Sequence, residues 1–127
     1  MKKLIRNRQP VKVLVIEEDP SSLEIIKTLL NQNDFELLAI APAIGKIDLL
    51  LETFQPNIIL AALELNSIGI FDFIATPQYL NTPLIGMSQS LDDEMFDRCL
   101  EHGKCLLLGK PINRYAFLSS INLLLRI

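Results

Sequence analysis

The chain has 127 residues, of which 50% are apolar and 21% are charged, so it can fold as one domain with a core and is not compositionally disordered. Its formal net charge of −3 argues against non-specific nucleic-acid binding, which needs a basic surface. The only basic cluster lies in residues 1–10, and we expect a solvated arm there, followed by one domain over residues 11–127.

Five short apolar runs alternate along the chain with longer segments of helical periodicity. The runs predict strands over residues 11–16, 35–40, 57–62, 83–88 and 105–108. The periodic segments predict helices around residues 23–30, 47–54, 95–100 and 115–127, and a weaker helix over 70–80. Strands that alternate with helices predict an α/β fold, in which a parallel sheet carries helices on both faces.

Residues at the helix ends support these boundaries. Asp19 precedes a proline at the first helical position, and Gly103 follows His102 at a helix end. We expect His102 to be a surface residue there, because a cation is favoured at the C-terminus of a helix.

No apolar run is long enough for an export signal or a membrane span, because the first run is interrupted at Lys12 and stopped at Glu17. We therefore expect a cytoplasmic protein with no membrane partner. Cys99, Cys105 and a single histidine are too few for a disulfide framework or a zinc site, and buried free thiols are the better interpretation.

Polar side chains follow three of the predicted strands, at the edge where ligands bind in open parallel sheets. Glu17 and Glu18 follow the first strand, Ser88 ends the fourth, and Lys110 follows the fifth. Carboxylates suit Mg²⁺, whereas a hydroxyl and an ammonium suit phosphoryl oxygens.

These residues carry a family resemblance. The stretches VLVIEEDP, PNIILAALEL, TPLIGMS and GKP, in this order, resemble the ends of the first, third, fourth and fifth strands of the receiver domains of two-component response regulators. The resemblance extends from about Val11 to the end of the chain. It implies the flavodoxin-like (βα)5 doubly wound fold, a five-stranded parallel sheet of order 2-1-3-4-5.

The resemblance also implies roles for four residues. Glu17 and Glu18 match the acidic pair that holds Mg²⁺, with Glu in place of the usual Asp. Ser88 matches the hydroxyl that turns toward the phosphoryl group, although it could equally cap the next helix. Lys110 matches the lysine that pairs with the phosphoacceptor, and its bond to Pro111 is usually cis in the family.

Ala62 falls at the phosphoacceptor position of the resemblance, and a methyl group can neither accept phosphate nor bind a metal. Leu107 stands where an aromatic switch residue is usual. In the loop after the third strand, Asn66 replaces a usual proline and Gly69 comes one residue early. We therefore expect a degenerate, or pseudo-receiver, site with no metal and no cofactor, in which Lys110 pairs with Glu18 or Glu17.

Glu64 challenges this interpretation. It lies two residues past Ala62, on the same side if the strand continues. Glu64 could be a displaced phosphoacceptor, or a permanent negative charge that imitates the phosphorylated state. The interpretation preferred from the sequence is that it is simply an exposed glutamate in a loop.

The leading hypothesis is a non-enzymatic, phosphorylation-independent interaction module in two-component-type signalling. It would bind a kinase, an output domain or a second copy of itself through its fourth and fifth helices. The last helix has more apolar residues than one buried stripe needs, and the interface residues expected from it are Phe117, Leu118, Ile121 and Leu125.

Two alternatives remain open. One is a conventional switch that takes phosphate at Glu64 or another acceptor with Mg²⁺. The other is a small-molecule-binding flavodoxin-like domain, which is disfavoured because the segment EEDPSS after the first strand has no glycine to cradle a phosphate.

Overall fold

A computed structural model describes residues 10–41, 53, 55–63 and 82–125 of the chain. Its elements, in chain order, are β1 (Lys12–Ile16), α2 (Pro20–Gln32), β2 (Glu36–Ala41), β3 (Ile58–Ala62), β4 (Leu84–Ser88), α5 (Asp93–His102), β5 (Cys105–Gly109) and α6 (Arg114–Leu125). All five predicted strands are present. The predicted helices over 47–54 and 70–80 and the basic arm lie outside the described residues, apart from Pro10 and Thr53.

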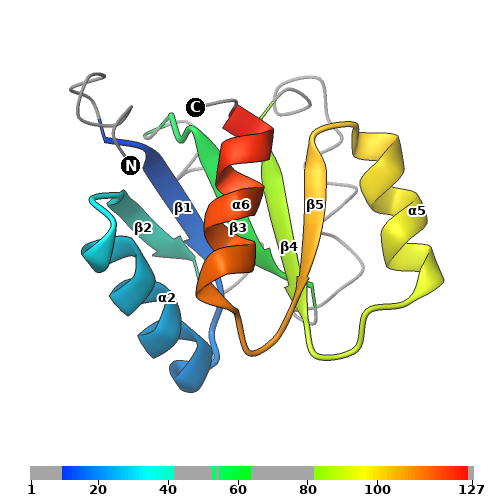
Figure 1. Ribbon diagram of the computed structural model, residues 1–127, viewed down its shortest axis with the longest axis horizontal. Coiled ribbons are helices and arrows are strands. Elements are labelled where there is room, and N and C mark those ends of the chain that lie inside the picture. The colour runs from blue at the N-terminus through cyan, green and yellow to red at the C-terminus, as the bar shows by residue number, and fades with distance from the viewer. Residues whose placement is uncertain (1–9, 42–52, 54, 64–81, 126–127) are drawn as a thin grey trace.

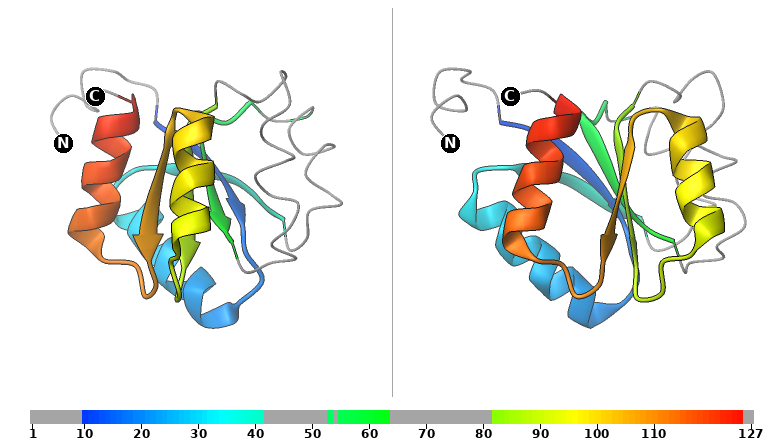
Figure 2. Two further views of the ribbon diagram at one scale, coloured as in Figure 1. Left: turned by 90° about the vertical axis from the view of Figure 1, so that its right-hand side faces the viewer. Right: turned by 45° about the vertical axis from the view of Figure 1, so that its right-hand side comes forward.

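The five strands form one parallel sheet in the order β2-β1-β3-β4-β5. Helices α2 and α6 lie against one face of the sheet, and α5 lies on the opposite side of β5 from α6 (Figures 1 and 2). This is the predicted doubly wound, flavodoxin-like arrangement. The strand order brings the ends of β1, β3, β4 and β5 to one edge, where the predicted site residues lie.

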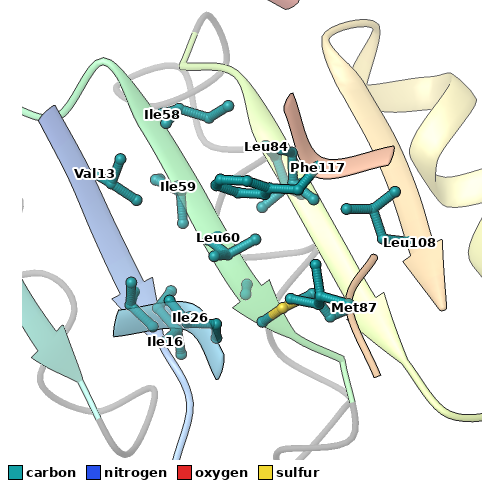
Figure 3. Close-up of a cluster of buried hydrophobic side chains, with 14 of the residues drawn as sticks. Val13, Ile16, Ile26, Ile58, Ile59, Leu60, Leu84, Met87, Leu108 and Phe117 are labelled. Atoms are coloured by element: carbon teal, nitrogen blue, oxygen red, sulfur yellow. The ribbon is translucent and has the colours of Figure 1, made fainter. Parts of the chain in front are cut away.

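The central strands are apolar except for Ser88 at the end of β4, because both of their faces are covered. Every residue of β3 and β4 is buried. Figure 3 shows Phe117 of α6 and Ile26 of α2 lying over the side chains of the sheet. The Phe117 ring meets the ring of Phe35 edge to face, with centroids 6.0 Å apart and an interplanar angle of 86°. Such pairs add about 0.5–1.5 kcal/mol to the free energy gained by burying the rings.

Aspartates cap the helices that follow β1 and β4. Asp19 accepts a hydrogen bond from the Ser22 N–H at 2.9 Å, and this bond lowers the pKa of Asp19. Asp92 accepts one from the Met95 N–H at 2.8 Å. These bonds satisfy donors that a helix start leaves unpaired, and so fix the chain as it leaves the carboxyl edge of the sheet. None of the helices described here is both long and apolar enough to cross a membrane.

Candidate functional site

Glu17 is the buried centre of the candidate site. It follows the last residue of β1, and 1% of its surface is exposed. Its Oε2 accepts hydrogen bonds from the backbone N–H groups of Glu18 and Asp19, at 3.0 and 3.1 Å. Its Oε1 lies 2.7 Å from the Nζ atom of Lys110. A buried carboxylate needs such partners, because an isolated buried charge is very costly.

Lys110 reaches this carboxylate from the end of β5, a strand that does not neighbour β1. It follows β5, its side chain is 7% exposed, and its backbone N–H donates to the Ser88 carbonyl at 2.9 Å. The strand order puts β3 and β4 between β1 and β5, so the ion pair lies across the ends of these two central strands. Of the two partners considered from the sequence, the structure pairs Lys110 with Glu17, whereas Glu18 is exposed. The Lys110–Pro111 bond is cis, as the resemblance implies.

Ala62 ends β3 at the same edge. Its Cα is paired with that of Met87, and the β1–β3 register pairs Ile16 with Ala61, which puts Glu17 level with Ala62. Ala62 is 1% exposed, and the following Leu63 is 2% exposed. The end of β3 therefore brings only apolar side chains, from residues 61 to 63, to an edge that elsewhere carries a carboxylate and an ammonium.

Ser88 closes a turn rather than facing an open site. Its side chain is buried, and its Oγ accepts a hydrogen bond from the Ser90 N–H at 3.0 Å. Serine hydroxyls commonly stabilise local turns in this way. The helix-capping role considered for Ser88 is not what its contacts show: its Oγ stabilises the turn after β4, and Asp92 caps α5.

The residues present do not fit a Mg²⁺ ion. Both oxygens of Glu17 already have partners, since the ammonium of Lys110 pairs with Oε1 and two backbone N–H groups donate to Oε2. Ala62 adds no ligand oxygen. Over the described part of the chain, no group of three or more His, Cys, Asp or Glu side chains could hold a metal ion. Mg²⁺ needs near-octahedral oxygen coordination, which one exposed Glu18 carboxylate does not supply.

Leu107 packs over Gly86 of the neighbouring strand β4. It is half-buried on β5, and its Cδ2 lies 2.9 Å from the position that a Cβ on Gly86 would occupy. The side chain of Leu63 approaches the same point to 3.0 Å. A Cβ at position 86 would therefore require the ends of these two leucine side chains to shift.

The structure corrects part of the predicted interface. Phe117 and Ile121 are each 1% exposed, because they form the inner side of α6 and pack in the core. Leu118 and Leu125 are only partly buried and remain available at the surface. Apolar count alone could not separate the two groups, since α6 carries apolar residues on several sides.

The predicted interface residues do not include the large apolar residues that are most exposed in the described part of the chain. These are Phe96 at 47% and Leu100 at 79% on α5, and Tyr115 at 75% and Leu123 at 68% on α6. Phe96 and Leu100 are four residues apart, so they share one side of α5. The buried Cys99 is adjacent to Leu100 in sequence and lies about 100° away around the helix, so the spacing that grouped the two residues on one face did not show which of them the sheet would cover.

His102 is also corrected. It was expected at the surface, but it is 8% exposed. Its Nδ1 accepts a hydrogen bond from the Lys104 N–H at 3.2 Å, and its Nε2 is buried without a hydrogen-bond partner among the described residues. Burial, and then the charge of Lys104, lower the pKa of His102. Residues Glu64, Asn66 and Gly69 lie outside the described residues.

Comparison with known proteins supports the fold. No protein-family model matches the chain. No curated protein matches it either. Solved structures do match. A proposed response regulator from Chloroflexus aurantiacus superposes with a TM-score of 0.80 at 15% identity, covering 94% of this chain and 100% of that one.

Two further structures give the same result. The receiver domain of a DNA-binding response regulator from Colwellia psychrerythraea has a TM-score of 0.77 at 23% identity, over 92% of this chain and 99% of that one. The chemotaxis response regulator CheY4 of Vibrio cholerae has a TM-score of 0.75 at 18% identity, over 91% and 99%. The chain therefore has the receiver-domain fold, along nearly its whole length.

Proposed function

We propose that this chain is a degenerate receiver-type domain that acts without phosphorylation, as a protein-interaction module in two-component-type signalling. The observation that carries the proposal is the pairing of Glu17 with Lys110 beside Ala62. A receiver of the ordinary kind needs an acceptor carboxylate and a free acidic pair at this point. Here the acceptor position holds a methyl group and one acid of the pair is committed to the lysine.

The proposal assigns no catalytic step to the chain. Its regulatory role would depend on a binding surface of fixed shape, because the Glu17–Lys110 ion pair holds the domain in a single conformation. The similar solved chains are response regulators or their receiver domains, and this is the reason for placing the function in two-component-type signalling and in the cytoplasm.

The proposed docking face combines α5 and α6. Four exposed apolar side chains lie on these two helices, namely Phe96, Leu100, Tyr115 and Leu123, and Leu118 and Leu125 add partly buried ones. Large exposed apolar groups of this kind favour association with another protein. A kinase, an output domain or a second copy of the chain could fill this role.

Phosphorylation can be tested directly. The chain is incubated with acetyl phosphate and Mg²⁺, and its intact mass is measured. We expect no phosphoryl adduct. The matched variant Ala62→Asp restores an acceptor carboxylate at the same place, and any labelling it gains would show that the assay can detect the modification.

The same assay tests the alternative switch. A stoichiometric adduct on the unmodified chain would refute phosphorylation-independence. Repeating the experiment with Glu64→Gln would then show whether Glu64 is the acceptor, since its amide cannot form an acyl phosphate.

Self-association is tested by sedimentation at several protein concentrations. If the docking face joins two copies, Leu100→Ser and Leu123→Ser should each weaken the dimer, whereas Lys27→Ser on the exposed side of α2 should not. A monomer at all concentrations would leave a different protein as the partner.

A further inference from the structure

Helix α5 has a pair of exposed apolar residues beside a row of exposed acids. Phe96 and Leu100 are 47% and 79% exposed, and their spacing of four residues puts them on one side of the helix. Asp93, Asp97 and Glu101 recur at the same spacing and are all exposed. The first two acids lie three residues before the two apolar residues, so the acidic row and the apolar pair are neighbours on the helix surface.

The acidic row has little positive charge beside it on its own helix. From its N-cap to its last residue, α5 has a net charge of −4, because it contains one cation, Arg98, and five exposed carboxylates, namely Asp92, Asp93, Glu94, Asp97 and Glu101. The Nε atom of Arg98 lies 3.6 Å from Oε1 of Glu101. Like charges four residues apart repel one another, and Glu101 also lies in the last turn, where the helix dipole disfavours an acid. A basic partner laid along this row would relieve both effects.

Residues 1–9 of this chain have the complementary composition. They contain no acid, two neighbouring apolar residues, Leu4 and Ile5, and four cations, namely Lys2, Lys3, Arg6 and Arg8. The apolar residues stand between the two pairs of cations. A segment with a charge of +4 therefore matches a helix with a charge of −4, and each carries a pair of large apolar residues beside its charges.

We propose that residues 1–9 of one copy bind along α5 of a second copy. This inference rests on the proposed interaction function, and it names the occupant of the α5 half of the docking face. The cations would pair with the acidic row, and the two apolar residues would cover Phe96 and Leu100. In a symmetric dimer the contact occurs twice, because each copy supplies one basic arm and one α5. The solvated arm expected from the sequence thereby gains a partner.

Reach favours a second copy over the same copy. Figure 1 shows the start of β1 and helix α5 toward opposite sides of the molecule. A path within one copy would cross three strand spacings, about 14 Å, and then the width of α5, about 10 Å. Nine extended residues span about 30 Å, so about 6 Å would remain to lie along α5, whose ten residues extend about 15 Å. The arm of a second copy loses no length in this way.

Charge also favours the arm over a second α5. Two α5 helices packed face to face would bring two charges of −4 together, and like charges at an interface oppose association. The arm covers the same apolar pair with opposite charges beside it. Complementary charges of this kind fix the orientation of a partner, while the apolar contact adds affinity.

The test is sedimentation of the full chain at several concentrations. We expect a dimer whose dissociation constant rises about tenfold between about 50 and 500 mM NaCl, because salt screens exposed charges. Lys3→Glu with Arg6→Glu reverses the arm, and Asp97→Lys with Glu101→Lys reverses α5. Each double variant alone should raise the dissociation constant by about tenfold or more, because like charges then meet.

Mixing the two variants gives the decisive measurement. The arm of each then meets an α5 of opposite charge, so a heterodimer should form with a dissociation constant within about threefold of that of the unmodified dimer. Misfolding of either variant could not produce this recovery. A matched control, Glu24→Lys with Glu36→Lys, changes the net charge as much as the α5 variant does, at exposed positions away from α5. This control should dimerise like the unmodified chain.

The apolar part of the contact has its own variant. Leu4→Ser with Ile5→Ser should raise the dissociation constant by about tenfold and leave its salt dependence unchanged, because the cations remain. A steeper or lost salt dependence in this variant would contradict the separate roles of the charges and the apolar pair.

The outcomes separate this inference from the proposed function. A monomer at every concentration in low salt, or no recovery in the mixture, would overturn the arm as the occupant of α5. If Leu100→Ser weakened a dimer that arm reversal left unchanged, the docking face would stand and the arm would be refuted. A phosphoryl adduct on a chain whose mixed variants do recover would instead refute phosphorylation-independence and leave the arm contact standing.

Discussion

The buried ion pair between Glu17 and Lys110 makes the sharpest prediction about stability. Lys110→Met removes the ammonium 2.7 Å from Oε1 of Glu17 and keeps most of the side chain's volume. With an effective dielectric constant of about 20, the lost attraction is about 6 kcal/mol. Because desolvation of the two charges offsets part of this, we expect the free energy of unfolding to fall by about 3–5 kcal/mol.

That loss is large beside the 5–15 kcal/mol that typically stabilises a domain, and urea unfolding should show it clearly. With a urea m-value of about 2 kcal/mol/M, the midpoint should fall by about 1.5–2.5 M with m unchanged. The matched control is Lys27→Met on the exposed side of α2, which should change the stability by less than about 0.5 kcal/mol.

A double variant tests the reason for the loss. Glu17→Gln together with Lys110→Met removes both charges and keeps an amide oxygen for the N–H groups of Glu18 and Asp19. It should be more stable than Lys110→Met alone, because no unpaired charge is left buried. If Lys110→Met behaved like Lys27→Met, or if the double variant regained nothing, the burial and pairing described here would be wrong.

Three further predictions follow from other contacts. Gly86→Ala should lower the free energy of unfolding by about 1–3 kcal/mol, because the added Cβ would meet Leu107 at 2.9 Å. The control Gly109→Ala, whose Cβ would have no neighbour within 4 Å, should lower it far less. Urea unfolding of both variants measures the difference. Burial lowers the pKa of His102, so the folded chain binds this proton less readily than the unfolded chain. The free energy of unfolding should therefore fall as the pH drops through 6.5, and His102→Gln should flatten this dependence. The resonance of the single histidine, followed by NMR, should titrate below pH 6.5. Asp92→Ala should cost about 1 kcal/mol by thermal unfolding, since it removes the cap of α5.

The strands and the strand order could be predicted because they depend on local pattern. Each short apolar run became a strand within one residue of its expected bounds, and the alternation with helices led to a parallel sheet. Asp19 and Gly103 marked real helix ends for the same reason, since capping depends on neighbouring residues.

Side-chain environments were harder to predict, because they depend on residues distant in the sequence. The burial of Phe117 depends on Phe35, which lies beside it only in the folded sheet. His102 looked like an exposed helix end, but its ring is covered and bonded to the next turn of the chain.

The candidate site was intermediate between these cases. Sequence placed Glu17, Ala62, Ser88 and Lys110 at one edge, and the structure has them there. It could not decide which glutamate the lysine would choose. That choice depends on backbone direction after β1, which buries the first carboxylate and turns the second toward solvent.

The Glu17–Lys110 pair has a mechanical consequence for β5. This strand is at the edge of the sheet, where peeling away and pairing with another molecule are ordinary hazards. The ion pair connects the end of β5 to the end of β1 directly, across the two strands that lie between them and independently of the backbone hydrogen bonds. If β5 separated from the sheet, the Glu17 carboxylate would remain buried without its cationic partner. Partial separation of this edge strand therefore has an electrostatic cost in addition to the loss of backbone hydrogen bonds.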